Sequence, residues 1–130
     1  MRLLLDTHVW LWMLSAPERL NAATQSTLTD SATELWLSVA SAWEVAIKHA
    51  RGTLPLQDRV GDLVALSSQS FGMSVLSIRL PHTLMAAELP PHHNDPFDRM
   101  LVAQALLEGM TLVTGDEIVA RYGATVLWAT

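Results

Sequence analysis

Four carboxylates in this sequence stand at the junctions between predicted strands and helices. They are Asp6, Glu44, Asp98 and Asp116. Asp6 and Asp116 follow apolar runs that are typical of strands, whereas Glu44 and Asp98 are expected in the first turn of a helix. In a parallel sheet, the ends of the strands and the starts of the following helices share one edge, where ligands bind. The four side chains are therefore predicted to converge on one cleft.

Carboxylates that lie within a few ångströms of one another repel, and each raises the pKa of its neighbours. A divalent cation removes this repulsion, and Mg²⁺ and Mn²⁺ prefer hard oxygen ligands of this kind. Four acids could hold one ion together with its water shell, or two ions. Because two ions about 4 Å apart can activate a water and stabilise the leaving oxygen of a phosphodiester, the pattern indicates a metal-dependent phosphodiesterase.

Each acid also has a purely structural interpretation. Asp6 could cap the next helix, and Glu44 could be favoured by the electric field of a helix N-terminus. Asp116, within "TGDE", could be an ordinary turn residue. Asp98 is harder to explain in this way, because Asp95 already supplies the cap of its helix. The shared placement of all four acids favours the metal site.

The elements that position these acids are predicted from apolar patterns, caps and turn residues. Strands are expected at Arg2–Leu5, Glu34–Ser41, Ser74–Ile78, Thr111–Val113 and Ala124–Trp128. Helices are expected at Thr7–Leu14, Pro17–Ser31, Ala42–Arg51 with Ser41 as its cap, Leu56–Phe71, a short stretch from Pro81, and Pro96–Glu108. Because strands alternate with helices, we expect a parallel sheet covered on both faces, which makes the fold class α/β.

The chain has 130 residues, and we expect one domain over residues 1–130. Half of the residues are apolar, but no apolar run approaches the ~20 residues that span a bilayer. We therefore expect no membrane segment. There is no cysteine, so disulfides and thiolate chemistry are excluded; this fits a cytoplasmic protein, and the N-terminus does not resemble a signal peptide. The net charge of -5 argues against broad affinity for nucleic acid, but not against nucleic-acid chemistry at one metal site.

Four segments occur in an order and at intervals that resemble a known family. They are "LLLDTHVWLWML", "SVASAWEVAIK", "DPFDRMLVAQAL" and "TLVTGDEIVARYGATVLW". Over Arg2–Trp128 the chain is similar to the PIN-domain nucleases, and among these to the VapC-type toxins of bacterial toxin–antitoxin pairs. The resemblance implies a single PIN-like nuclease domain, with a three-layer α/β/α fold and a central, mainly parallel sheet. It also implies an acidic pocket that binds Mg²⁺ or Mn²⁺ and hydrolyses RNA by a metal-activated water.

The resemblance assigns roles residue by residue. The metal-binding and catalytic acids of the family fall on Asp6, Glu44, Asp98 and Asp116. Thr7 and Thr114 match positions where a hydroxyl supports these acids, and Asp95 is interpreted first as a helix cap and then as a supporting acid. Among the cations, Arg99 and Lys48 are candidate phosphate contacts.

Two partners follow from the same resemblance, a small cognate antitoxin and a second copy of the chain in a homodimer. Antitoxin tails of this family lie across an apolar surface. We expect some of the five tryptophans to line such a groove, on the helices of residues 7–31 and 42–66.

Other functions remain open. The chain could be a PIN-like binding module without catalysis. It could also be a magnesium-dependent phosphatase of the haloacid dehalogenase type, but that class needs a second Asp where His8 stands. A zinc site at His92 and His93 is a further alternative. We interpret this pair as solvated loop residues, because no Cys/His spacing accompanies it.

Overall fold

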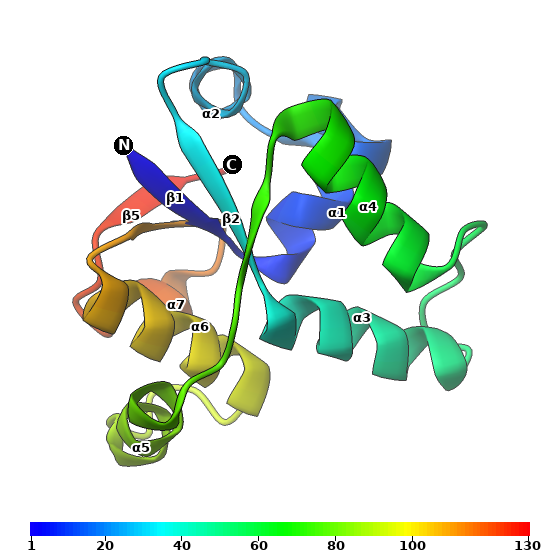
Figure 1. Cartoon of the computed structure of the whole chain (residues 1–130). Helices are drawn as coiled ribbons and strands as arrows, with labels where there is room; N and C mark the ends of the chain where they lie inside the picture. Colours follow the sequence, from blue (N-terminus) through cyan, green and yellow to red (C-terminus); the bar gives the residue numbers. More distant parts are fainter.

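Five parallel strands form the centre of the protein in a computed structural model that describes residues 1–130 (Figure 1). The strands are β1 (Arg2–Leu5), β2 (Glu34–Ser38), β3 (Ser74–Leu76), β4 (Thr111–Thr114) and β5 (Val126–Trp128). Their order across the sheet is β3-β2-β1-β4-β5, and every neighbouring pair is parallel. The N-terminal strand is therefore the central one, with β2 and β4 on its two sides.

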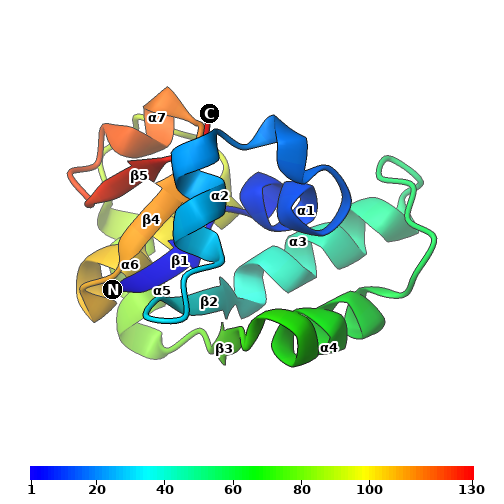
Figure 2. The same ribbon diagram turned by 90° about the horizontal axis from the view of Figure 1, so that it is seen from above.

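Helices cover both faces of this sheet and make the protein three layers thick. They are α1 (Thr7–Ser15), α2 (Ala22–Leu28), α3 (Val39–Ala50), α4 (Val60–Phe71), α5 (Leu80–Glu88), α6 (Pro96–Glu108) and α7 (Glu117–Ala120), with a 3-10 turn at Pro17–Arg19. Figures 1 and 2 show α1, α3 and α4 on one side of the strands and α5, α6 and α7 on the other. The predicted three-layer α/β/α fold with a parallel sheet is confirmed.

The alternation of side chains along β1 produces a separate core on each face. Leu3 and Leu5 join the core beneath α1, α3 and α4, whereas Leu4 joins the core beneath α6 and α7. All three leucines are fully buried. This burial on both faces explains why the strand is a continuous apolar run instead of an alternating one.

The carboxyl edge of the sheet gathers the starts of four helices. Helices α1, α3 and α7 follow β1, β2 and β4 directly. Helix α6 precedes β4 and runs back across the sheet, so its N-terminus reaches the same edge. Its bounds are those predicted: Asp95 caps the first turn, and Gly109 ends the helix with a φ of 65°.

Two predicted elements on the N-terminal side are wrong in their bounds. The helix expected at Pro17–Ser31 is a 3-10 turn followed by the separate helix α2. The chain is extended at Leu20, and the Asn21 side chain caps α2 by accepting a hydrogen bond from Thr24 N. The strand expected to reach Ser41 ends at Ser38, which caps α3 through its hydroxyl.

Further along the chain, α4 begins at Val60 and not at Leu56, and β3 ends at Leu76 instead of Ile78. The short helix α7 was not predicted, because four residues are too few to show a helical period. No helix of the structure combines the length and apolar character that crossing a membrane requires.

Candidate functional site

Asp6 is buried at the carboxyl end of the central strand with one oxygen unsatisfied. Its side chain is only 4% exposed. Oδ2 accepts a hydrogen bond of 2.7 Å from the Thr114 hydroxyl, whereas Oδ1 has no partner. Asp6 occupies the cap position of α1, yet its side chain makes no capping bond. Burial, the largest cause, raises the pKa of this carboxyl above its ordinary value. A buried carboxylate oxygen with no donor is costly, so the capping interpretation does not explain this residue.

Glu44 reaches the same edge of the sheet from α3. Because α3 starts at Val39, Glu44 lies in its second turn, and the predicted placement in the first turn is wrong. The side chain is 3% exposed, and both of its oxygens have donors. Oε1 accepts from the Thr7 hydroxyl at 2.8 Å, and Oε2 pairs with Lys48 Nζ at 2.7 Å.

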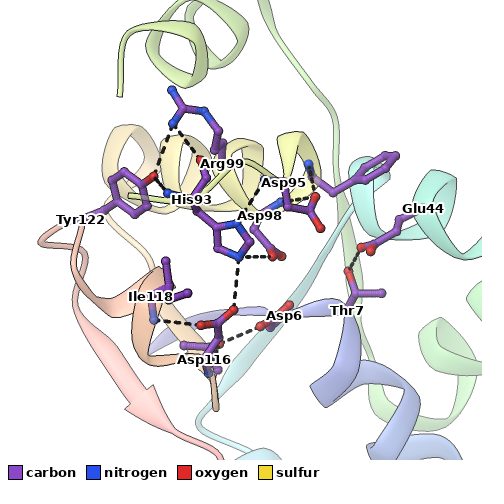
Figure 3. A network of polar contacts seen from close by, with 12 residues as sticks. Asp6, Thr7, Glu44, His93, Asp95, Asp98, Arg99, Asp116, Ile118 and Tyr122 are labelled. Atoms are coloured by element: carbon purple, nitrogen blue, oxygen red, sulfur yellow. Dashed lines mark hydrogen bonds and ion pairs between the residues drawn. The ribbon is translucent and has the colours of Figure 1, made fainter. Parts of the chain in front are cut away.

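Asp98 lies in the first turn of α6, as predicted, and faces the other acids. Burial, followed by the negative charges of Asp6, Asp95, Glu44 and Asp116, raises the pKa of its carboxyl to about 8. All of these acids are thus close enough to affect Asp98 electrostatically, and Figure 3 shows the carboxylates of Asp6, Asp98 and Asp116 directed toward one another. The four acids thus lie at the same edge of the sheet, and the groups whose ligand atoms are all within 4.8 Å of one another are His93, Asp98 and Asp116.

Asp116 is the most exposed of the four acids, with 36% of its side chain accessible. It caps α7 by accepting from Ile118 N through Oδ1 at 2.8 Å. Thr114 connects it to Asp6, because the Thr114 hydroxyl accepts from Asp116 N at 3.0 Å and donates to Asp6 Oδ2. Asp6 and Asp116 also border a pocket together with His8, Trp12, Gly115 and Thr130.

His93 is a member of this cluster that the sequence analysis missed. Its Nε2 lies 3.0 Å from Asp98 Oδ2 and 3.3 Å from Asp116 Oδ2, and its side chain is 18% exposed. The interpretation of His92 and His93 as a solvated pair holds only for His92, which is exposed and packs against Tyr122. The one available signal was that His93 precedes the cap of α6 by two residues, which places it beside the helix start.

The two candidate phosphate contacts have different surroundings. The Lys48 ammonium is half exposed beside Glu44. The Arg99 guanidinium points away from the acids in Figure 3 and donates to main-chain carbonyls of the α5–α6 segment, including those of Ala86, Leu89 and Pro90. Its donors are used within the fold, so Arg99 is not among the residues that the structure brings to the pocket. Asp95 caps α6, as predicted.

An apolar groove lies apart from the acids, between α1, the segment after α3, and α4. Its apolar lining consists mainly of Leu11, Leu14, Leu54, Leu56, Leu63 and Leu66. It contains no tryptophan, so the expectation that tryptophans line it is wrong. Trp10 is instead fully buried, where its Nε1 donates to the Ser67 hydroxyl at 2.8 Å.

Comparison with protein families gives one match that covers most of the chain. The PIN domain family model matches residues 3–124. No curated protein sequence matches the chain significantly.

Three solved structures illustrate the similarity of the fold. VapBC2 from Rickettsia felis, bound to a DNA fragment from its promoter, is 13% identical with a TM-score of 0.72, covering 98% of both chains. VapBC-1 from nontypeable Haemophilus influenzae is 18% identical with a TM-score of 0.69, covering 98% of this chain and 97% of that one. A toxin–antitoxin complex from Klebsiella pneumoniae is 16% identical with a TM-score of 0.65, covering 96% and 95%. At these identities the likeness establishes the fold.

Proposed function

The chain belongs to the PIN domain family, and on that premise we propose that it is a metal-dependent endoribonuclease. We further propose that it is the toxin of a toxin–antitoxin pair and acts on RNA in the cytoplasm. The observation that carries the proposal is the unsatisfied, buried Oδ1 of Asp6 within a converging group of four acids. A helix cap, a turn or a solvated surface acid would not leave this oxygen without a donor.

The residues present fit a hard divalent cation such as Mg²⁺ or Mn²⁺. The donors around Asp6 are carboxylate oxygens. Burial, followed by the neighbouring acids, raises the pKa of Asp98, and a bound cation would offset both effects. Oδ2 of Asp98 pairs with His93, which leaves its Oδ1 without a protein donor, although only Oδ1 of Asp6 is a buried atom without a partner. These two oxygens are therefore the ones we expect to bind the ion directly, which agrees with the preference of Mg²⁺ for one or two carboxylates.

Glu44 and Asp116 have a different role in this proposal. Each of their four carboxylate oxygens already accepts from a protein donor. These oxygens retain lone pairs. We expect them to accept hydrogen bonds from water molecules bound to the ion and not to bind the ion directly. The hydroxyls of Thr7 and Thr114 fix the acids, and Asp95 orders the helix start that carries Asp98.

A bound Mg²⁺ supplies Lewis acidity toward a phosphate oxygen and lowers the pKa of a coordinated water. The protein supplies the geometry: Asp6, directly after the central strand β1, and Asp98, on the first turn of α6, would hold the ion at the carboxyl edge. Lys48, half exposed beside Glu44, is positioned to pair with a phosphate of the substrate backbone. No side-chain nucleophile is required.

Two partners complete the proposal. The apolar groove bordered by α1 and α4 suits a small antitoxin segment, because its leucines are only partly buried and Leu66 is exposed. The toxin–antitoxin complex from Klebsiella pneumoniae, which shares this fold, supports such a partner. We also propose a homodimer, which the mass of the purified chain in solution will test.

The direct test is cleavage of RNA by the purified chain with Mg²⁺, with Mn²⁺ and with EDTA. We expect cleavage only with metal, and a loss of at least about 100-fold in Asp6→Asn and Asp98→Asn, since each removes a direct ligand. Asp62→Asn, an exposed acid on α4, is the matched control and should cleave like the wild type. Cleavage in EDTA, or full activity in both site variants, would contradict the proposal. An inactive wild type that still binds an antitoxin would instead support a binding module.

A further inference from the structure

His93 occupies the space between two of the proposed metal-site acids. Its Nε2 is within hydrogen-bond distance of Asp98 Oδ2 and of Asp116 Oδ2, at 3.0 Å and 3.3 Å. Figure 3 shows the imidazole inserted between these side chains, which come from α6 and from the turn after β4. A histidine in this position could bind the metal ion itself, or it could hold the carboxylates that do.

The second ring nitrogen distinguishes these two roles. Nδ1 of His93 accepts a hydrogen bond of 3.1 Å from the main-chain N–H of Asp95. An accepting Nδ1 carries no hydrogen, so in the neutral ring the hydrogen is on Nε2. A histidine that binds metal through Nε2 normally donates its other N–H to an acceptor. Here the other nitrogen faces a donor, so ligation through Nε2 would sacrifice the bond from Asp95 N.

The main chain of His93 is fixed on both sides of the ring. Its N–H donates to the Tyr122 hydroxyl at 2.7 Å, and its carbonyl accepts from Arg99 Nη1 at 3.2 Å. Arg99 also donates to Leu89 O at 2.7 Å and to Ala86 O at 2.8 Å, which anchors the segment that leads to His93. The main chain therefore fixes the position from which the ring extends. A flip of the ring itself would lose the bond from Asp95 N to Nδ1 and the contacts of Nε2 with Asp98 and Asp116.

We propose that His93 is a positioning residue of this site: its Nε2–H holds the carboxylates of Asp98 and Asp116, and it does not bind the metal ion. The inference rests on the proposed function, because it concerns the same metal site. With Oδ2 of Asp98 paired with His93, Oδ1 of Asp98 would remain for the ion, together with the unpaired Oδ1 of Asp6. The ion then meets oxygen ligands only, which favours Mg²⁺ and Mn²⁺ over metals that prefer imidazole.

The test measures metal binding directly, with Mn²⁺ as the probe. Binding is followed by the electron paramagnetic resonance signal of free Mn²⁺, and pulsed measurements on the bound ion detect any directly coordinated nitrogen. The wild type is expected to bind Mn²⁺ without a coordinated nitrogen. His93→Ala should weaken binding by about 10- to 100-fold, the range for loss of a group that orients ligands. His93→Gln keeps an N–H donor and should recover most of the affinity, and His92→Ala on the same loop should bind like the wild type.

Two results would overturn the role of His93. One is a directly bound nitrogen in the wild type that disappears in His93→Ala, which would make His93 a ligand. The other is wild-type Mn²⁺ affinity in His93→Ala. Both leave the proposed nuclease intact if RNA cleavage still depends on Asp6. Absence of saturable Mn²⁺ binding in the wild type, or binding unchanged by Asp6→Asn, would overturn the metal site and the proposed function with it. Circular dichroism and thermal unfolding of each variant confirm that it is folded.

Discussion

Burial and the neighbouring acids raise the pKa of Asp98, so a bound cation competes with a proton for this carboxyl. Its ordinary pKa of 3.8 rises to about 8 in the folded protein, first through burial and then through the neighbouring acids. Between these two values the folded chain carries a proton that the unfolded chain has lost. Metal-free protein therefore loses stability as the pH rises through this window. A cation that replaces the proton is favoured more strongly as the pH rises.

This competition predicts the pH dependence of metal affinity. The apparent affinity for Mg²⁺ should rise by about tenfold for each pH unit from pH 6 to about pH 8 and then level off. Isothermal titration calorimetry at several pH values measures this slope. In metal-free Asp98→Asn, the fall in unfolding temperature between pH 6 and pH 8 should be smaller than in the wild type. An affinity for Mg²⁺ that is flat from pH 6 to pH 8 would contradict the expectation.

The types and approximate places of the four acids could be predicted from the sequence, because strand ends and helix starts are local signals. The contacts that decide the role of each acid could not be predicted from the sequence. The unsatisfied Oδ1 of Asp6 depends on its burial in the fold, and one donor to Glu44, the Thr7 hydroxyl, lies far away in the sequence. The same holds for His93 and Arg99, whose partners come from other segments of the fold.

At the scale of elements, the loop between α5 and α6 is organised by one side chain. Arg99, on the second turn of α6, donates to carbonyls of Ala86, Leu89, Pro90 and His93. These carbonyls lie at the end of α5 and in the Pro-rich loop, where no helix or strand provides main-chain donors. The Arg99 side chain therefore replaces the regular hydrogen bonds that this segment lacks.

Arg99→Ala is expected to lower the free energy of unfolding by about 2–4 kcal/mol, because several charge-assisted hydrogen bonds are lost at once. Arg99→Lys should be nearly as destabilising, since an ammonium cannot replace the planar fork of donors. Urea unfolding measures both variants. Arg121→Ala removes an exposed arginine next to the same region and should change stability by less than about 0.5 kcal/mol. Equal stability of Arg99→Ala and the wild type would show that the loop does not need these bonds.

The bounds of helices and strands were predicted most accurately where capping residues mark both ends. Helix α6 has an Asp cap, a Pro in its first turn and a Gly at its end, and both of its bounds were predicted. The segment Pro17–Ser31 has a start signal but contains Asn21, which begins a second helix. Asn21 is held there by β5, since its Nδ2 donates to Trp128 O and its N–H to Ala129 O. That contact is tertiary, so no local pattern could predict it.

For the whole molecule, the acidic site and the apolar groove are separate surfaces joined by α1. Thr7 at the start of α1 contacts the acidic site through Glu44, and Leu14 near its end lines the groove. Seven residues of helix rise by about 10 Å, which separates the two functions by a short distance. A partner bound in the groove is therefore close to the proposed active site without sharing its residues.

This separation predicts that binding of the antitoxin and cleavage of RNA can be impaired independently. Leu66→Glu places a charge in the groove at a residue that is 45% exposed, so the fold should tolerate it. We expect at least about tenfold weaker binding of a cognate antitoxin, with unchanged RNA cleavage. Leu107→Glu, on α6 and outside the groove, is the control. Equal antitoxin affinity in both variants would place the partner elsewhere.

The site draws its four acids from both ends of the chain, from Asp6 to Asp116, and its central strand β1 is paired with β4. During translation, the edge of β1 that pairs with β4 therefore has no partner until residues 111–114 have been synthesised. A chain interrupted before residue 116 contains at most three of the acids and lacks the hydroxyl of Thr114 if it stops before β4 is complete. We therefore expect chains truncated before Thr114 to lack RNA cleavage, because β1 then has no β4 partner and Asp6 loses the hydrogen bond from the Thr114 hydroxyl.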